Sequence, residues 1–371
     1  MATGCIMIFL LVSRAENPSS PGSAPTVQTR RLSPSEVWVR PKGHTGERDS
    51  RLRELAFENR TLDLVILGNS RAFSVSQEFF HTGLKVRNVS IGGANVQEMM
   101  ALWQALLSLK QHPSTLLIFI DPSTLHEEIQ IPESLRPYWE AYYGLNTRPM
   151  LEKGGASKAG IANHRLESKE ILGKVFELSG LFSWDGVRVA LETWVQPKGS
   201  GQGASIISKK DLPPAWTAYA FDGSQILPRR DRTAHLSIQE AVNTLDEDPD
   251  AAGFESQPSH IQSLALLRDW LRRIAVQRER VVLVLPSYAP AVYRKLEDRH
   301  REALMQFAAA VNRIAVENGV TFCNAMDPAL SNCSSDDFRD DVHAEPVCVR
   351  RFVQRCFRQG GENALLDDSG G

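Results

Sequence analysis

Five short apolar runs along the chain predict the strands of a parallel β-sheet. They are LDLVIL at residues 62–67, KVRNVS at 85–90, LLIFI at 116–120, VVLVLP at 281–286 and GVTFCN at 319–324. Nearly continuous apolar runs of this length are typical of strands that helices cover on both faces. The pattern therefore favours an α/β protein.

Apolar residues repeat at helical spacing in three of the intervals between these runs. The stripes are Met99, Leu102, Trp103, Leu106 and Leu107; Leu264, Leu267, Trp270, Leu271 and Ile274; and Leu304, Phe307, Val311 and Ile314. We interpret all three as helix faces that pack on a core. Strands that alternate with helices predict right-handed crossovers and a three-layer, doubly wound sheet of five parallel strands in flavodoxin-like order.

The same pattern predicts how the chain is organised. Residues 61–125 and 258–360 form the α/β domain, and residues 126–257 form a large inserted cap between the third and fourth strands. This insertion is far longer than ordinary loops of about 2–6 residues. Residues 16–60, which begin with a run rich in Pro and Ser, are interpreted as a linker and lead-in, and residues 361–371 as a disordered tail.

Aromatic residues are frequent in the predicted insertion. They are Trp139, Tyr142, Tyr143, Trp184, Trp194, Trp216 and Tyr219. We expect an aromatic-rich helix at residues 133–145, a helical pair at 168–195 and a turn at Asp222-Gly223. For any single ring a place in the small core of a cap is the favoured interpretation, and a stacking surface for sugars is the alternative.

Residues 1–15 contain an apolar run, ATGCIMIFLLV, that is shorter than the roughly 20 residues needed to span a bilayer. No Lys or Arg precedes the run, as the first part of a signal peptide would require. Two interpretations stay open. The run is the remnant of a signal or anchor segment, which would tether the protein to a membrane, or it is a disordered or misassigned start.

Charge and cysteine content limit the function classes. The chain has 42 basic and 44 acidic residues, and this balance argues against a nucleic-acid partner. Four of its five cysteines, Cys323, Cys333, Cys348 and Cys356, lie in the last fifth of the chain without metal-ligand spacing. They fit either disulfides of a periplasmic or extracytoplasmic protein or buried thiols.

Cys348 and Cys356 fall in one predicted helix, where eight residues separate their Cα atoms by about 12 Å. That distance is too long for a disulfide between the two. Any disulfide must therefore reach Cys323 or Cys333.

Polar or glycine-rich segments follow every predicted strand. They are Gly68-Asn69-Ser70-Arg71, Ser90-Ile91-Gly92-Gly93-Ala94-Asn95, Asp121-Pro122-Ser123, Pro286-Ser287-Tyr288 and, beyond the fifth strand, DDFRDDVHAEP at residues 336–346. A doubly wound sheet binds its ligand beyond the carboxyl ends of its strands. These segments are therefore the expected rim of a functional site.

The last segment contains Asp340 and His343, spaced so that the carboxylate can orient the imidazole. Ser70 after the first strand can meet them over the sheet, giving a nucleophile, a base and an orienting acid in the chain order Ser, Asp, His. The residues after this strand are expected to start a helix, whose positive end would lie at Ser70. The amides of Ser70 and of the Gly92-Gly93 turn are candidate donors to an oxyanion. Arg71 and Asp121 are candidate substrate-binding residues, although pairing with Asp121 is the simpler interpretation of Arg71.

This combination resembles the SGNH (GDSL-type) hydrolase superfamily, in particular a GNSR-type branch related to bacterial exopolysaccharide O-acetyltransferases. The resemblance makes Ser70 the block-one serine, Gly93 or Gly92 the block-two glycine, and Asp340 and His343 the block-five pair. It covers the five-strand scaffold, about half of the chain, and leaves the insertion unexplained.

Two positions depart from the family pattern. Asn69 stands where the family usually has Asp, and Asp121-Pro122 stands where block three has Gly-x-Asn-Asp. The block-three Asn of the family donates to the oxyanion, and loss of one such donor typically costs about 10²–10³ in rate. Asn95 is our candidate to replace it.

The sequence thus predicts a serine O-acyl esterase or acyltransferase, without metal or cofactor, acting on an acylated carbohydrate, most simply an acetylated one. Two other classes stay open. A degenerate SGNH-like protein would bind glycan or scaffold an export complex without turnover. A flavodoxin-like module would hold a phosphate with the amides around Ser70 and with Arg71.

Overall fold

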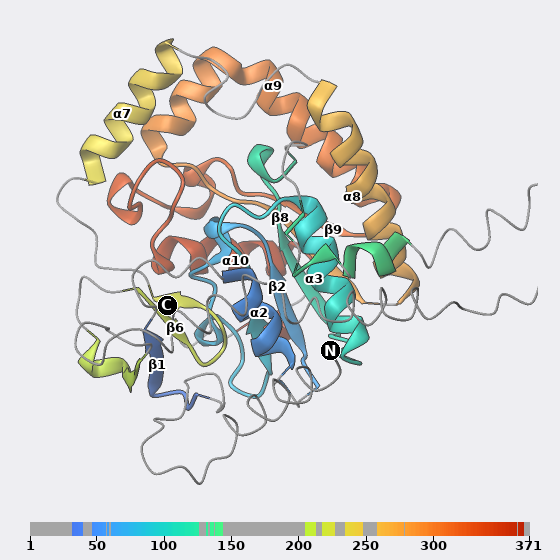
Figure 1. The fold of residues 1–371 in the computed structure, drawn as a ribbon. Coiled ribbons are helices and arrows are strands. Elements are labelled where there is room, and N and C mark those ends of the chain that lie inside the picture. Colours follow the sequence, from blue (N-terminus) through green and yellow to red (C-terminus); the bar gives the residue numbers. More distant parts are fainter. Residues whose placement is uncertain are drawn as a thin grey trace, which may run out of the picture.

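The computed structural model shows an α/β protein with two β-sheets (Figure 1). It describes residues 32–39, 47–56, 58, 61–125, 131–132, 134–136, 138–143, 205–212, 217–226, 234–247, 258–277, 279–361 and 363–366. The N-terminal apolar run and the helical pair expected at residues 168–195 lie outside these ranges. No described helix is both long enough and apolar enough to cross a membrane.

The larger sheet has five strands, all parallel, in the order β3-β2-β4-β8-β9. The strands are β2 (Leu64–Leu67), β3 (Val86–Asn88), β4 (Thr115–Phe119), β8 (Arg280–Leu285) and β9 (Thr321–Asn324). All five strands predicted from apolar runs are confirmed. Every residue of β2, β3 and β4 is buried, as expected of strands covered on both faces.

Helices cover both faces of this sheet. The helices that follow the strands are α3 (Val96–Ser108), α8 (Pro258–Val276), α9 (Pro290–Glu317) and α10 (Pro346–Gln359). In Figure 1, α3 and α8 lie on one side of the strands and α10 on the other, where Phe352 of α10 packs on Phe119 of β4. The three predicted apolar stripes lie on α3, α8 and α9 and form part of the main core.

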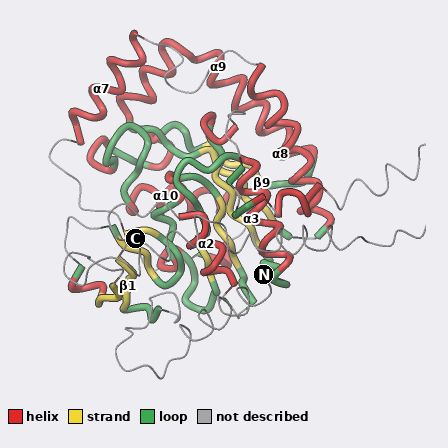
Figure 2. Tube along the Cα trace, in the orientation of Figure 1, coloured by secondary structure: helices red, strands yellow, loops and turns green. Residues whose placement is uncertain are grey.

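Helix α7 (Ala234–Glu247) packs on α9, and the two form an arch beyond one end of the strands. Loops lie between this arch and the sheet (Figure 2). The described part of the chain also contains short 3₁₀ turns: η2 (Ser70–Ala72), η3 (Gln77–Phe79), η4 (Pro122–Leu125), η6 (Lys209–Asp211), η8 (Pro328–Ser331), η9 (Ser335–Asp337) and η10 (Asn363–Leu365).

A second, antiparallel sheet was not expected from the sequence. Its strands are β1 (Glu36–Val39), β5 (Ser205–Ser208), β6 (Ala218–Ala220) and β7 (Gln225–Ile226), in the order β5-β1-β6-β7. It joins residues from the predicted lead-in to residues from the predicted insertion. The expected turn at Asp222-Gly223 is confirmed, because it connects β6 and β7 and Gly223 has a φ of +81°.

Strand β3 lies at one edge of the large sheet, and the β6–β7 turn covers that edge. The carbonyl oxygen of Asp222 accepts a hydrogen bond of 2.7 Å from the Asn88 N–H, and its carboxylate accepts another from the Gln77 N–H. Gly223 lies so close to the Asn88 carbonyl that a Cβ atom would overlap it. The edge of the large sheet is therefore protected on this side from pairing with another strand.

The two ends of the described chain also differ from expectation. Helix α2 (Glu47–Ala56) lies within the segment interpreted as linker and lead-in, and buries Leu55 in the main core. At the other end, Leu366 is 3% exposed and pairs with Phe80. The prediction of a disordered tail is therefore wrong for residues 363–366, because an apolar side chain there has a core to join.

Two disulfides join the last part of the chain. Cys323 bonds to Cys356 and Cys333 bonds to Cys348, so each pair includes one residue of α10 and one residue outside it. This confirms the prediction that each disulfide reaches Cys323 or Cys333. The pairs hold the segment between β9 and α10, which carries Asp340 and His343, at both of its ends.

Of the described rings of the insertion, Tyr142 and Tyr219 are buried, whereas Trp139 and Tyr143 are partly buried and pack against the main core. Tyr142 is fully buried against α8, where its hydroxyl lies 3.0 Å from Asp269 and the Arg273 guanidinium stacks 3.7 Å from the ring centroid. Trp103, which contacts Tyr142, donates to Glu279 just before β8. Strands of a parallel sheet share direction, so this cluster lies toward the end of the sheet opposite to Ser70.

Glu279 gives a pH-dependent prediction. Burial raises the pKa of its carboxyl from 4.5 to about 7, although the hydrogen bond from Trp103 acts in the opposite direction. Between pH 4.5 and about pH 7, Glu279 therefore holds a proton in the folded protein that it has lost in the unfolded chain. Its free energy of unfolding should fall as pH rises from about 4.5 to about 7 and then level off.

Urea unfolding of wild type and of Glu279→Gln, measured at intervals from pH 4.5 to 8, checks this. We expect the free energy of unfolding of the variant to fall less with rising pH than that of wild type, because the variant lacks the Glu279 carboxyl. Parallel stability curves for the two proteins would contradict the assignment.

Candidate active site

Ser70 lies in a sharp turn at the carboxyl end of β2. Gly68 makes this turn possible, because a Cβ atom there would come within 2.8 Å of the Phe119 Cβ and 3.0 Å of the Ala72 Cβ. Asn69 caps the turn by accepting a hydrogen bond from the Arg71 N–H. The strand thus ends with the serine side chain on the rim of the sheet.

The helix expected to start at Ser70 does not form in the described chain. The described chain forms only the single 3₁₀ turn η2 at this point. The amide group of Asn88, from the neighbouring strand β3, donates to the carbonyls of Ala72 at 2.8 Å and Val75 at 2.9 Å. These carbonyls therefore accept hydrogen bonds from a side chain and not from the N–H groups of a helix. Without a helix here, Ser70 lacks the positive potential expected from a helix N-terminus.

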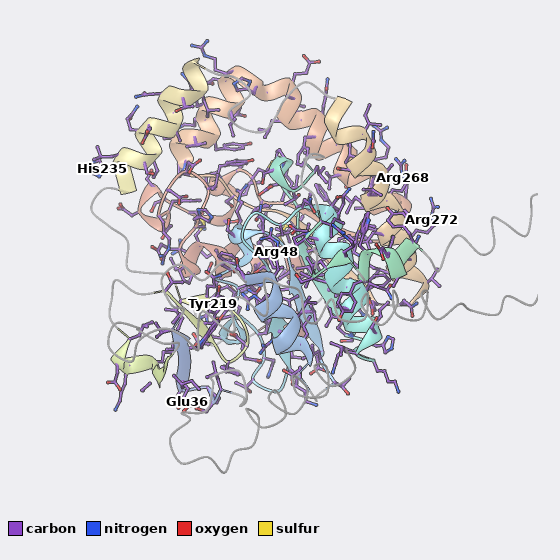
Figure 3. The ribbon with its side chains drawn as sticks, viewed as in Figure 1. Glu36, Arg48, Tyr219, His235, Arg268 and Arg272 are labelled. Carbon is purple, nitrogen blue, oxygen red and sulfur yellow. A yellow bond between two sulfur atoms is a disulfide. The ribbon has the colours of Figure 1, made fainter. Side chains whose placement is uncertain are left out.

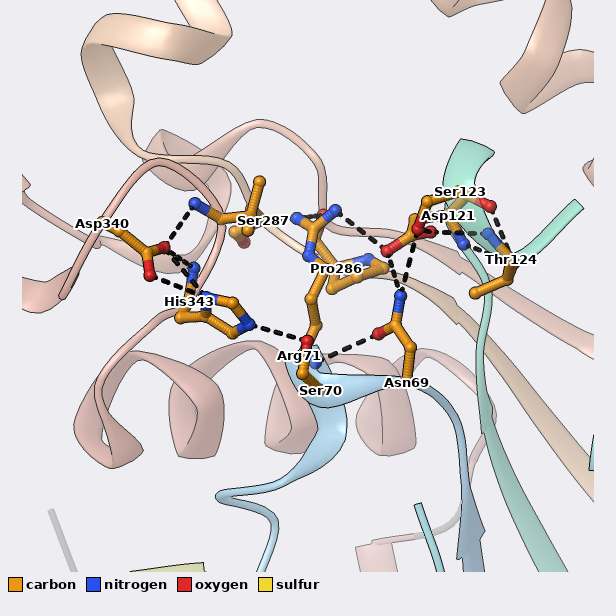
Figure 4. Close-up of polar contacts among 11 residues, drawn as sticks. Asn69, Ser70, Arg71, Asp121, Ser123, Thr124, Pro286, Ser287, Asp340 and His343 are labelled. Carbon is orange, nitrogen blue, oxygen red and sulfur yellow. Dashed lines mark hydrogen bonds and ion pairs between the residues drawn. The ribbon is translucent and has the colours of Figure 1, made fainter. Parts of the chain in front are cut away.

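The structure brings Ser70, His343 and Asp340 together (Figure 4). The Nε2 atom of His343 lies 2.7 Å from the Ser70 Oγ atom. The Nδ1 atom lies 2.8 Å and 3.0 Å from the two carboxylate oxygens of Asp340. This geometry suits an imidazole that carries its proton on Nδ1 and accepts from the serine hydroxyl through Nε2.

Asp340 is held as a carboxylate. Burial raises the pKa of its carboxyl, but the hydrogen bond from the His343 ring, the imidazole charge and the N–H groups of His343 and Val342 outweigh burial, so the pKa lies below its ordinary value. Backbone contacts fix the loop: the Arg339 N–H donates to the His343 carbonyl, and the Asp341 carbonyl accepts from the Ala289 N–H.

Arg71 is buried beneath this rim. Its guanidinium donates to the carbonyls of Pro286 and Ser287, pairs with Asp121 at 3.4 Å and stacks 4.3 Å from the ring centroid of Tyr288. Pairing with Asp121 is the simpler of the two interpretations of Arg71 from the sequence, and it is the contact observed. A direct role of Arg71 and Asp121 in binding substrate stays a prediction.

The Asp121 carboxylate faces a set of hydrogen-bond donors. It accepts from Asn69 Nδ2 at 2.7 Å, Ser123 Oγ at 2.6 Å and Thr124 N at 3.0 Å, and it pairs with Arg71. The contact with Asn69 links the two departures from the SGNH pattern. An ionised Asp at position 69 could not donate to Asp121, whereas the Asn69 amide does.

The three residues expected at the oxyanion differ in what they contact. The Gly92 N–H donates to Glu47 at 3.1 Å. Gly93 has a φ of +64°, and its N–H has no acceptor within the described part of the chain. Asn95 caps α3 by accepting from the Glu98 N–H, while its buried Nδ2 has no described partner. Their role toward an oxyanion stays a prediction.

The sequence did not predict the contacts of Asn69 and Ser123 with Asp121, nor any role for Glu47 near the site. Asn69 and Ser123 lay inside the predicted rim segments, so their contact with Asp121 could have been proposed from position alone. Glu47 carried no such signal, since it belongs to a charged segment far from any predicted strand.

Neither protein-family models nor curated proteins gave a match to this chain. Among the described residues, no group of three His, Cys, Asp or Glu side chains is placed to hold a metal ion. The chemistry of the site is therefore inferred from its own geometry.

The pairing of Asn69 with Asp121 can be tested by exchanging the two groups. Asn69→Asp places two buried carboxylates at hydrogen-bond distance, and we expect a loss of about 3 kcal/mol of stability at pH 8. The loss should shrink as pH falls and the pair retains a proton. The double variant Asn69→Asp/Asp121→Asn restores one donor and one carboxylate and should recover most of the stability.

Urea unfolding at pH 5 and pH 8 measures all four proteins of this cycle. Asp121→Asn alone removes the counter-charge of Arg71 and should also be unstable. If the double variant is no more stable than the worse of the two single variants, the two positions are not coupled as described.

Proposed function

We propose that this protein is a serine-dependent O-acyl esterase or acyltransferase. The observation that carries the proposal is the hydrogen-bonded row of Ser70, His343 and Asp340, with 2.7 Å between Ser70 Oγ and His343 Nε2. A base within this reach of a hydroxyl can take its proton as the hydroxyl attacks a carbonyl. The lowered pKa of Asp340 supports its role in stabilising the imidazolium that forms.

In the proposed reaction, Ser70 Oγ bonds to the carbonyl carbon of an ester and its proton passes to His343 Nε2. The carbonyl oxygen becomes an oxyanion held by backbone N–H groups of the rim. Breakage of the ester C–O bond expels the alcohol, which takes the proton from His343 and leaves Ser70 acylated. Water or an acceptor hydroxyl then gives a proton to His343 and attacks the acyl carbon. Breakage of the bond from Ser70 Oγ to the acyl carbon releases the acid or the new ester, and Ser70 Oγ takes the proton back from His343.

The fold is consistent with an SGNH-like domain. The strand order β3-β2-β4-β8-β9 is what a flavodoxin-like doubly wound sheet requires, and the proposed nucleophile follows its first strand. We propose that the segment between β4 and β8 is an insertion into this domain, part of which pairs with β1. Its role as a cap belongs to the same proposal.

A second candidate function is glycan binding without turnover. The observation that favours it is the Asp121 carboxylate at the end of β4, where the family pattern would place an oxyanion donor. The third class, a phosphate-binding module, is less well supported. It needs Arg71 to reach an anion, whereas the guanidinium is buried and bonded to Asp121 and to two backbone carbonyls.

Ser70→Ala and His343→Ala test the catalytic unit. We expect each to lower kcat for a short ester by about the same factor, on the order of 10⁴–10⁶, because loss of either member disables the unit. Asp340→Asn should cost on the order of 10⁴. Ester hydrolysis and labelling of Ser70 by a fluorophosphonate measure these effects.

Ser76→Ala and the exposed His81→Ala are matched controls and should keep wild-type rates. Wild-type activity or labelling in Ser70→Ala would rule out this nucleophile. An inert wild-type protein that binds oligosaccharide would favour the second candidate function.

We further propose that the substrate is an O-acetyl group on a carbohydrate outside the cytoplasm. Family likeness supports the carbohydrate, whereas Tyr142 and Tyr219 are buried core residues and give it no support. A small acyl group predicts higher kcat/KM for acetyl esters than for esters of eight or more carbons. Equal or better turnover of the long-chain esters, measured beside acetylated oligosaccharides, would contradict it.

A further inference from the structure

Helix α2 contacts the segment that follows β3 through three charged side chains. Arg48 pairs with Glu98 near the start of α3, and the Arg51 Nε atom donates to the Ser90 carbonyl at 3.1 Å. Glu47 accepts from the Gly92 N–H. The helix thus holds residues 90–98, which include both glycines of the predicted oxyanion loop.

The Glu47 carboxylate also contacts the small sheet. Its Oε1 atom accepts from the Tyr219 hydroxyl at 3.0 Å and from Gln225 Nε2 at 2.8 Å, while its Oε2 atom accepts from Gly92. Arg51 stacks 4.7 Å from the ring centroid of Tyr219. Arg48 and Tyr219, labelled in Figure 3, mark the two elements that meet here.

These contacts give the two glycines different functions. Gly92 already has an acceptor for its N–H, and a backbone amide held by a carboxylate is not free for a substrate oxygen. Gly93 is solvent-exposed, adopts a left-handed conformation and has no described acceptor. Of the two amides, the geometry leaves that of Gly93 available.

We infer that Glu47 is a positioning residue for the oxyanion loop, and this inference rests on the proposed function. By binding the Gly92 N–H with one oxygen, and Tyr219 and Gln225 with the other, Glu47 fixes the Ile91-Gly92 peptide and so orients the next peptide, which carries the Gly93 N–H. The Gly93 N–H, together with the Ser70 N–H, then donates hydrogen bonds to the oxyanion. The small sheet acts on the reaction through this carboxylate and does not touch the substrate.

Glu47→Gln separates the contact from simple packing. The side-chain orientation that keeps both contacts with Tyr219 and Gln225 retains an oxygen at the Oε1 position. The NH₂ group of the glutamine then faces the Gly92 N–H. Both groups are donors, so the hydrogen bond to Gly92 is lost while those from Tyr219 and Gln225 remain. Glu78→Gln is the matched control, because its exposed carboxylate pairs with Lys209 beside the same sheet.

Steady-state hydrolysis of p-nitrophenyl acetate is the first measurement. We expect Glu47→Gln to lower kcat about 10–100-fold, because a misplaced donor stabilises the transition state less, with KM unchanged. Glu78→Gln should retain wild-type values. An unchanged kcat in folded Glu47→Gln overturns the inference.

The second measurement identifies the amide and needs no variant. In protein labelled with ¹⁵N-glycine, reaction of Ser70 with a fluorophosphonate should move the Gly93 amide proton downfield and leave that of Gly92 in place. In free Glu47→Gln the Gly92 amide proton should move upfield as its carboxylate acceptor is lost. A downfield shift at Gly92 on labelling, with none at Gly93, overturns the inference even when Ser70 reacts.

The two proposals fail in different ways. Wild-type protein that neither turns over esters nor reacts at Ser70 overturns the proposed function, and with it any catalytic role of Glu47. Wild-type protein that reacts at Ser70 while Gly93 stays unmoved overturns only the role assigned to Glu47.

Discussion

The buried guanidinium of Arg71 is the contact on which the rest of the site depends, because it joins the ends of three parallel strands. It lies directly after Ser70 at the end of β2, pairs with Asp121 after β4 and donates to two carbonyls after β8. A desolvated cation is tolerated only when acceptors surround it. The planar guanidinium fork can reach all of them at once and still stack on Tyr288, whereas a lysine ammonium could not. Anchoring Arg71 also anchors its neighbour, the proposed nucleophile.

Local sequence patterns were sufficient where structure depends on neighbouring residues. LDLVIL and LLIFI predicted strands because each run is apolar along its length, and the stripe from Met99 to Leu107 predicted the buried face of α3. The approach of Ser70 to Asp340 and His343 followed from a geometric rule, since parallel strands present their carboxyl ends at one edge. The 2.7 Å contact between Ser70 and His343 shows that this rule placed residues 273 positions apart within hydrogen-bond reach.

Patterns were insufficient where a distant residue decides the local structure. The helix expected after Ser70 is replaced by one short turn because Asn88, on another strand, binds the carbonyls involved. Strand β1 is only EVWV, too short to be distinguished from a linker, and it is a strand because β5 and β6 pair with it. Glu47 gave no signal for the same reason: its partners Gly92, Tyr219 and Gln225 come from two other parts of the chain.

The pairing of β1 also has a consequence for how the protein is made. Glu36 pairs with Ser208, so β1 leaves the ribosome long before the strands that complete its sheet have been synthesised. Closing a loop of roughly 170 residues costs chain entropy, and contacts between residues close in sequence do not offset that cost. The strands β2, β3 and β4 are available much earlier, whereas the sheet behind Glu47 must wait for β5 and β6. The support of the glycine loop is thus assembled late, and a chain released before β6 would carry Ser70 without it.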